Sequence, residues 1–158
     1  MEQLDRLTQS VCDLHKLVCK SSDLDVLAQT NVETVFDGLQ ATTNLCHGLA
    51  ARSGWWTDKT TGLQIARDTP RLVVEKLCLI HSEVSEAMEG DRKDLMDDKL
   101  VHRKMLEVEL ADVLIRVHDL AGFLGLDLAG AVIEKLAFNQ VRPDHQMANR
   151  LAEGGKAY

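Results

Sequence analysis

The 158-residue chain carries 18 Lys and Arg residues against 25 Asp and Glu, a formal net charge of −7. A surface this acidic disfavours a nucleic-acid backbone or an anionic membrane as the main partner. No apolar run approaches the roughly 20 residues that a membrane-spanning helix needs, and the first residues do not resemble a secretion signal. We therefore expect a soluble cytoplasmic protein that binds neither nucleic acid nor membranes.

The composition is typical of an all-α protein. Prolines number only two, and β-branched residues rarely alternate with polar ones as they do in strands. Apolar residues recur instead at spacings of three and four. We expect a bundle of four to six helices in which short connections join antiparallel neighbours.

The first half of the chain is predicted to hold three helices. Apolar spacing predicts one helix over residues 4–18 and another from the capping serines at 21–22 to Gly54. Residues 55–62 form a loop that carries both tryptophans. A third helix is predicted from Thr69-Pro70, with Thr as N-cap and Pro in the first turn, to about Gly90.

The second half is predicted to hold two helices after a charged segment. Residues 91–104 are rich in Asp, Lys and Arg, and we expect a solvated connector there. The next helix covers 104–124 and closes at Gly125. Asp127 then caps a last helix that Pro143 ends.

Two of the predicted helices carry acidic pairs at the same spacing. Glu83 and Glu86 stand three residues apart on one helix, and Glu109 and Asp112 stand three apart on the next. At about 100° per residue, each pair borders the apolar arc of its helix, whereas His118 lies on the side expected to face water. Carboxylates beside an apolar arc are partly buried, and buried charges need partners.

Two kinds of partner are considered for these carboxylates. Lys76, Arg116 or the cations of the charged connector would form ordinary ion pairs with them. Alternatively, a divalent cation would sit among them, and hard oxygen ligands suit Mg²⁺ or Mn²⁺. The matching phase of the two pairs favours the metal. A di-iron bundle is disfavoured, because none of the six histidines follows a glutamate by three positions.

The last predicted helix presents Lys135, Asn139 and Arg142 within about 60° of one another. Two cations and an amide on one face suit the phosphates and sugar of a nucleotide. The alternative is a solvated basic stripe that stabilises the C-terminal end of the helix. For Trp56, stacking on a base and covering the edge of the core are equally good interpretations.

Three segments together resemble the MazG-like nucleotide pyrophosphohydrolases. They are Leu79–Gly90 (LIHSEVSEAMEG), Glu107–Asp119 (EVELADVLIRVHD) and Glu134–His145 (EKLAFNQVRPDH). The resemblance covers about residues 45–150 and rests on the two acidic pairs and the Lys-x-x-x-Asn-x-x-Arg run jointly. It implies a MazG-like helical bundle that is completed by oligomerisation as a homodimer or homotetramer.

The resemblance also implies an activity and a set of site residues. The activity is Mg²⁺-dependent hydrolysis of a nucleoside triphosphate to the monophosphate and pyrophosphate. Glu83 or Glu86 would take the proton of the attacking water. The implied metal ligands are Glu83, Glu86, Glu109 and Asp112, and the implied substrate-binding residues are Lys135, Asn139 and Arg142, to which we add Trp56 as a candidate for stacking on the base. One departure is Ser82, where many members have glutamate, and Glu89 is a candidate substitute.

We treat residues 1–158 as one domain with three parts. Residues 1–45 are expected to serve packing and oligomerisation, residues 46–145 to form the catalytic core, and residues 146–158 to form a tail. Two other functions stay open. Phosphoribosyl-ATP pyrophosphatase shares the acidic helices of the superfamily, and a non-catalytic helical module would use its acidic pairs as salt bridges.

Overall fold

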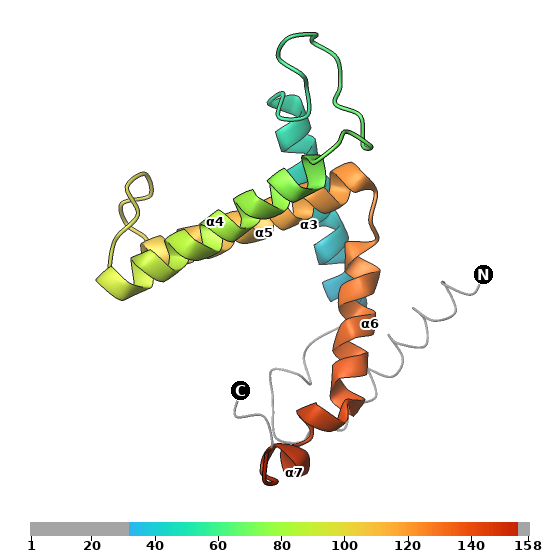
Figure 1. Cartoon of the computed structure of the whole chain (residues 1–158), viewed down its shortest axis with the longest axis vertical. Coiled ribbons are helices and arrows are strands. Elements are labelled where there is room, and N and C mark those ends of the chain that lie inside the picture. The colour runs from blue at the N-terminus through green and yellow to red at the C-terminus, as the bar shows by residue number, and fades with distance from the viewer. Residues whose placement is uncertain (1–31, 155–158) are drawn as a thin grey trace, which may run out of the picture. The chain divides into compact units, whose positions relative to one another are not determined.

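The computed structural model describes residues 32–154, and these residues are helical without a strand (Figure 1). The all-α prediction is confirmed for this part of the chain. No helix within it is long and apolar enough to cross a membrane. The predicted helix at 4–18 and the start of the next one lie outside the described residues. The elements are α3 Val32–Arg52, α4 Leu72–Lys93, α5 Met105–Leu124, α6 Leu128–Val141, the 3-10 helix η1 Pro143–His145, and α7 Met147–Arg150.

The described residues divide into two compact units. One comprises residues 41–126, and the other comprises 32–40 together with 127–154. The division falls within the segment 46–145 that the sequence analysis treats as one catalytic core. Each unit is therefore described by itself.

Helices α4 and α5 form an antiparallel hairpin and pack side by side along their length (Figure 1). Gly90 lies against the first turn of α5, near the end of the hairpin. A Cβ atom on Gly90 would lie 2.9 Å from the Cβ of Met105. Glycine is required at this point because a side chain would push the helices apart.

An aromatic core lies at the other end of the hairpin, in the same unit. Trp56 and Phe123 stack with their ring centres 3.7 Å apart and their planes at 7°, and Leu72 and Leu120 complete the buried cluster. Trp55, in contrast, is 66% exposed. The loop that follows α3 thus contributes one tryptophan to the core and leaves the other in solvent.

Several helix ends agree with local sequence signals. Helix α5 closes at Gly125 in the left-handed conformation, with φ 71°, and Asp127 caps α6 by accepting a hydrogen bond from the Gly130 N–H at 2.8 Å. Both predictions are confirmed. The start of α4 is later than predicted, because Arg71 adopts φ 66° and the helix begins at Leu72. Thr69 is therefore not its N-cap.

The end of α4 also differs from the prediction. The helix continues past Gly90 to Lys93 and ends at Asp94, which has φ 52°. Gly90 does not act as a stop signal because its missing side chain serves the contact with α5. From the sequence alone, this glycine predicts a helix end, because the contact with α5 that requires a glycine involves residues distant in the chain.

The connector between α4 and α5 is more ordered than the solvated segment that we predicted. Most of it is exposed, but Asp97 is buried and accepts hydrogen bonds from the backbone N–H groups of Lys99, at 3.0 Å, and of Leu100. Met96 and Lys104 pair as an isolated antiparallel bridge. The connector, residues 94–104, is therefore an ordered loop that is held by the hydrogen bonds of Asp97 and by this bridge.

His118 is buried, at 5% exposure, although we predicted that its face of the helix meets water. Its Nδ1 lies 2.8 Å from the Thr43 hydroxyl of α3. The prediction was wrong because α3 covers this face of α5. Burial lowers the pKa of His118, so that the ring is neutral at pH 7.

Substitution of Gly122 by alanine should destabilise the protein. A Cβ atom there would lie 2.5 Å from the Cβ of His47, so α3 and α5 must separate. We expect the free energy of unfolding to fall by about 1–3 kcal/mol, measured by urea denaturation. A Cβ atom on Gly48 of α3 would meet nothing within 4 Å among residues 32–154 apart from the neighbouring backbone of its own helix, and Gly48→Ala should raise stability by up to about 1 kcal/mol. Equal effects at both positions would contradict the close approach.

Candidate metal centre

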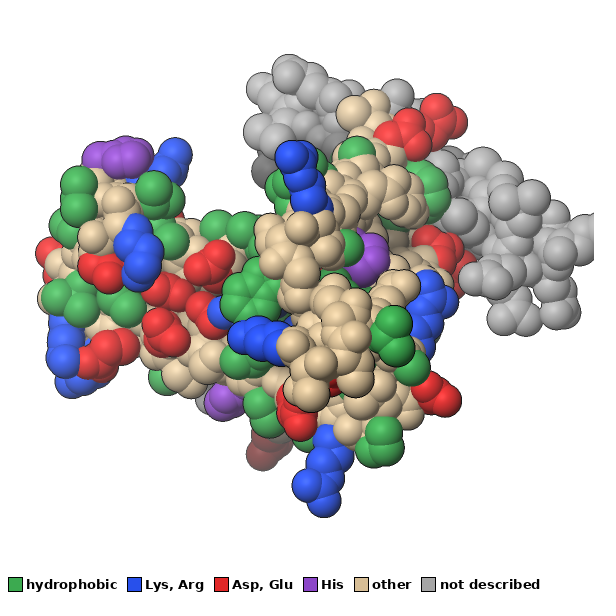
Figure 2. Space-filling model, turned by 90° about the horizontal axis from the view of Figure 1, so that it is seen from above, with side chains coloured by type: hydrophobic (Ala, Val, Ile, Leu, Met, Phe, Trp, Pro, Cys, Tyr) green, Lys and Arg blue, Asp and Glu red, His purple; other side chains and the backbone are tan. Residues whose placement is uncertain are grey.

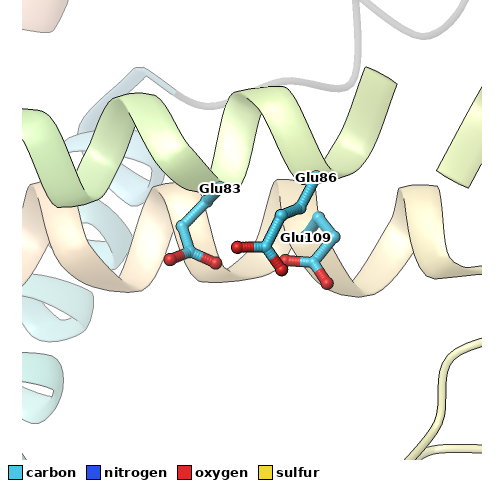
Figure 3. A group of neighbouring side chains, drawn as sticks. All are labelled: Glu83, Glu86 and Glu109. Atoms are coloured by element: carbon cyan, nitrogen blue, oxygen red, sulfur yellow. The ribbon is translucent and has the colours of Figure 1, made fainter. Parts of the chain in front are cut away.

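Three of the four predicted carboxylates meet on one side of the hairpin (Figure 3). Glu83 and Glu86 extend from α4 and Glu109 from α5, and each offers an oxygen within 4.8 Å of the others. Glu83 and Glu109 are buried, and Glu86 is exposed. Oxygens on opposite sides of a Mg²⁺ ion lie about 4 Å apart, since each Mg–O bond is about 2.1 Å. The three side chains thus offer oxygen donors that could hold one small divalent cation.

Asp112, the fourth predicted ligand, is not part of this cluster of three. It lies one turn after Glu109 on α5 and lines the same pocket. Its pKa is raised, first by burial and then by the charge of Glu83, while the Arg116 guanidinium opposes the shift. Its direct contact with a metal stays a prediction.

The cluster is electrostatically unfavourable without a cation. The pKa of Glu109 is raised from 4.5 to about 7, first by burial, then by its hydrogen bond with Glu83, and further by the charges of Glu86, Glu83 and Asp112. Burial penalises a charged carboxylate and like charges add to that penalty. A divalent cation among the three groups would remove both effects.

The ion-pair alternative accounts for only part of this cluster. Arg116 Nη2 lies 2.8 Å from Glu83 Oε1. Lys76 lies 4.3 Å above the Trp56 ring instead, and Lys99 of the connector pairs with Asp98. Within residues 32–154, no ion pair is formed by Glu109. Ion pairing therefore accounts for one carboxylate of the three, through Arg116.

The three carboxylates line a cavity of about 700 Å³ enclosed by α4, α5 and the connector. We call this cavity the acidic pocket. Figure 2 shows Asp and Glu side chains gathered with a few Lys and Arg side chains around the hairpin, at the left of the view. The charged residues that line it are Glu83, Glu86, Asp97, Asp98, Lys99, Glu109, Asp112 and Arg116. Its volume is in the range of small-molecule sites.

The three predicted substrate-binding residues lie in the unit formed by 32–40 and 127–154. Lys135 and Asn139 are on α6, whereas Arg142 follows the last residue of α6 with an extended backbone, so the predicted helical face does not include it. Lys135 Nζ lies 5.0 Å and the Arg142 guanidinium 5.9 Å from the centre of the Phe138 ring, so the two cations share one aromatic neighbour. Arg142 also pairs with Asp144 through two hydrogen bonds of 3.0 and 2.6 Å. Their role toward a substrate stays a prediction.

Asn139 is the most unusual of these three residues. Its Oδ1 atom is buried and has no hydrogen-bond partner in the described part of the chain. A buried acceptor without a donor is uncommon in folded proteins. The Asn139 Oδ1 atom is therefore available to accept a hydrogen bond from a bound molecule.

Trp56 belongs to the core, which is one of the two interpretations considered for it. It is 2% exposed and its Nε1–H donates to Asp119 Oδ1 at 2.7 Å. His47 Nδ1 lies 3.0 Å from the same oxygen. Asp119 thus holds the tryptophan and the histidine together, and the Trp56 ring has no free face for a base.

Two further sequence expectations concern the surroundings of the acidic pocket. Glu89, considered as a substitute ligand, pairs with Arg92 and Lys93 near the surface of α4 and does not line the pocket. Asp97, which does line it, was not singled out from the sequence. The signal that could have found it is the turn Asp97-Asp-Lys-Leu100, because an aspartate often caps the N–H groups two and three residues later.

Comparisons with known proteins give no further assignment: no family model, curated protein or solved structure matches the chain.

Neutralising Glu109 should stabilise the metal-free protein above pH 7. A carboxyl whose pKa is raised in the folded state holds its proton more tightly there than when unfolded. The free energy of unfolding therefore falls as the pH rises from about 4.5 to about 7. Glu109→Gln should remove that fall, measured by denaturation in EDTA across this range.

The control for this experiment is Glu107→Gln, which removes the same charge two residues away. Glu107 is exposed and lies 3.5 Å from Arg103. We expect its pH profile to follow the wild type. If Glu109→Gln instead unfolds more easily than the wild type at pH 8, the cluster is held by ion pairs.

Proposed function

We propose that this protein is a Mg²⁺-dependent nucleoside triphosphate pyrophosphohydrolase of the MazG-like type, acting in the cytoplasm. The observation that supports it best is the cluster of Glu83, Glu86 and Glu109 from two adjacent helices beside a pocket of suitable size. The reaction is attack of water on a phosphorus of the triphosphate, which releases the nucleoside monophosphate and pyrophosphate. Three ingredients are needed: a metal, a proton acceptor and a cationic environment for the phosphates.

The carboxylates provide the first two ingredients. Glu83, Glu86 and Glu109, with Asp112 beside them, would hold Mg²⁺, and the ion would supply charge neutralisation for the phosphates and a lowered pKa for a bound water molecule. Glu83 is buried and paired with Arg116, whereas Glu86 is exposed at the pocket. Of the two candidate bases, Glu86 is therefore better placed to accept the proton of the water.

The proposed binding residues for the nucleotide are Lys135 and Asn139 on α6 and Arg142 directly after its last residue. Lys135 and Arg142 carry the positive charge that a triphosphate requires, and Asn139 carries an amide that can hydrogen-bond to a sugar or a phosphate. Support for this assignment comes from the resemblance of the Lys-x-x-x-Asn-x-x-Arg run and from the unpaired Oδ1 of Asn139.

Phosphoribosyl-ATP pyrophosphatase is the second enzymatic candidate, because it uses the same kind of acidic helices. The non-catalytic module is less well supported, since Arg116 compensates only Glu83. A panel of NTPs, dNTPs and phosphoribosyl-ATP, assayed for pyrophosphate release with and without Mg²⁺, separates the three. No release from any of them, with Mg²⁺ or Mn²⁺ present, would overturn the enzymatic proposal.

We also propose that two or four copies of the chain associate through the apolar side of the hairpin. At about 100° per residue, four exposed residues of α4 fall within about 60° of one another, and two of α5 within about 40°. These residues are Val73, Leu77, Val84 and Met88 on α4, and Leu110 and Leu114 on α5. Glu86 and Asp112 project from the opposite side of their helices. A contiguous apolar stripe of this kind is typical of a protein interface.

Neutralising any proposed ligand should abolish most of the hydrolysis. Glu83→Gln, Glu86→Gln, Glu109→Gln and Asp112→Asn keep the shape of the side chain but remove a charged oxygen ligand. We expect turnover to fall by about a hundredfold or more, measured as Mg²⁺-dependent pyrophosphate release. Glu89→Gln serves as the control on the same helix, because Glu89 pairs with Arg92 and Lys93. Normal turnover in Glu109→Gln would exclude the metal site.

Charge on the apolar stripe should dissociate the oligomer. Leu77→Lys and Leu114→Lys each place a charge on a side chain that is more than half exposed in the single chain, so folding should tolerate them. We expect light scattering at micromolar concentration to show a dimer or tetramer for the wild type and smaller species for the variants. Leu63→Lys, in a loop away from the stripe, should assemble normally. A monomeric wild type that retains activity would rule out this proposal.

A further inference from the structure

A guanidinium group can bind an anion through the N–H groups of Nε and Nη2 together. Arg116 uses only one of these two donors. Its Nη2 contacts Glu83 Oε1 at 2.8 Å, while its Nε is buried and has no hydrogen-bond partner among the described residues. Arg142 shows the complete arrangement, because its Nε and Nη2 both donate to Asp144. A buried N–H without an acceptor costs free energy unless a ligand supplies one. Arg116, which lines the acidic pocket, thus has an unused donor on this edge.

Lys99 is the second cation that lines this pocket. Its backbone N–H is held by the buried Asp97 at 3.0 Å, so the connector places it at the pocket. Its ammonium group contacts Asp98 at 2.9 Å, but both side chains are more than three-quarters exposed. An exposed ion pair of this kind contributes little to stability and exchanges readily with another anion.

Arg116 and Lys99 offset part of the negative charge that would otherwise repel a polyphosphate from the acidic pocket. A polyphosphate is strongly negative, and the pocket contributes six carboxylates against two cationic side chains. One divalent cation neutralises only part of that charge. Phosphate oxygens prefer a guanidinium fork, which can bind two oxygens at once, and a lysine as an additional point charge.

We propose that Arg116 and Lys99 bind the polyphosphate of the substrate in the acidic pocket, and that Glu83 holds Arg116 in place until a metal takes Glu83 as a ligand. This inference rests on the proposed function, since it names how the same site receives its substrate. A cation on Glu83 weakens the pair with Arg116 and makes both Nε and Nη2 available to one phosphate. Metal binding therefore prepares the site for phosphate binding.

The proposal predicts opposite effects of Arg116 on two ligands. Removing a competing positive charge beside Glu83 leaves the affinity for Mg²⁺ alone unchanged or increases it. The affinity for magnesium pyrophosphate falls, because the fork is lost. A merely structural arginine that orients Glu83 would instead weaken the binding of both ligands.

The test is calorimetric titration of the full chain with Mg²⁺ alone and then with magnesium pyrophosphate. Arg116→Gln should bind magnesium pyrophosphate about tenfold more weakly, and Lys99→Gln severalfold more weakly. Arg116→Lys keeps the charge without the fork and should fall between the wild type and Arg116→Gln. The matched controls are Arg103→Gln and Lys104→Gln, which remove the same charges from exposed residues paired with Glu107 and Asp94. Both controls should stay within about twofold of the wild type.

The outcomes separate this inference from the proposed function. Pyrophosphate binding that depends on Arg116 and Lys99 in a wild type without hydrolytic activity supports the inference and refutes the hydrolase. An active wild type whose Arg116 and Lys99 variants bind pyrophosphate like the controls refutes the inference alone. Weaker binding of Mg²⁺ in Arg116→Gln, or no binding of magnesium pyrophosphate by the wild type, also overturns it. If Arg116→Gln does not fold, Lys99→Gln and Arg116→Lys decide the question.

Discussion

Repulsion among carboxylates packed between two helices is the constraint on which the site depends. The interface of α4 and α5 buries Glu83 and Glu109 together, and the pKa of Glu109 rises to about 7 as a result. A folded domain ordinarily relieves such a cost with apolar residues or matched cations. Here Arg116 matches only Glu83. This charge is the physical reason for proposing a cation at this place.

The ends of the hairpin keep those carboxylates in position. At one end, Asp119 accepts hydrogen bonds that hold His47 and Trp56 against the aromatic core. At the other end, Gly90 lets the helices touch and Asp97 closes the connector over the pocket. Glu86 and Asp112 lie on the side of their helices opposite the exposed apolar stripe, so the proposed substrate site and the proposed interface between copies are on different surfaces.

The sequence by itself determined the features that depend on short stretches of chain. Apolar spacing predicted the helices, and Gly125 and Asp127 predicted helix ends, because capping involves only the adjacent turn. The phase of the acidic pairs relative to the apolar arcs also predicted that these carboxylates are at least partly buried, which is confirmed for Glu83 and Glu109 and wrong for Glu86, which is exposed. Helical geometry alone is sufficient for this kind of inference, since it relates the face of a residue to its position.

The tertiary structure decided which face each neighbouring element covers. His118 is buried because α3 covers it, and Gly90 continues α4 because α5 needs close approach there. Trp56 enters the core, while Asp97 reaches the pocket through the turn that follows α4. None of these outcomes is local, because burial and ion pairing depend on residues that are distant in the chain and close only after packing.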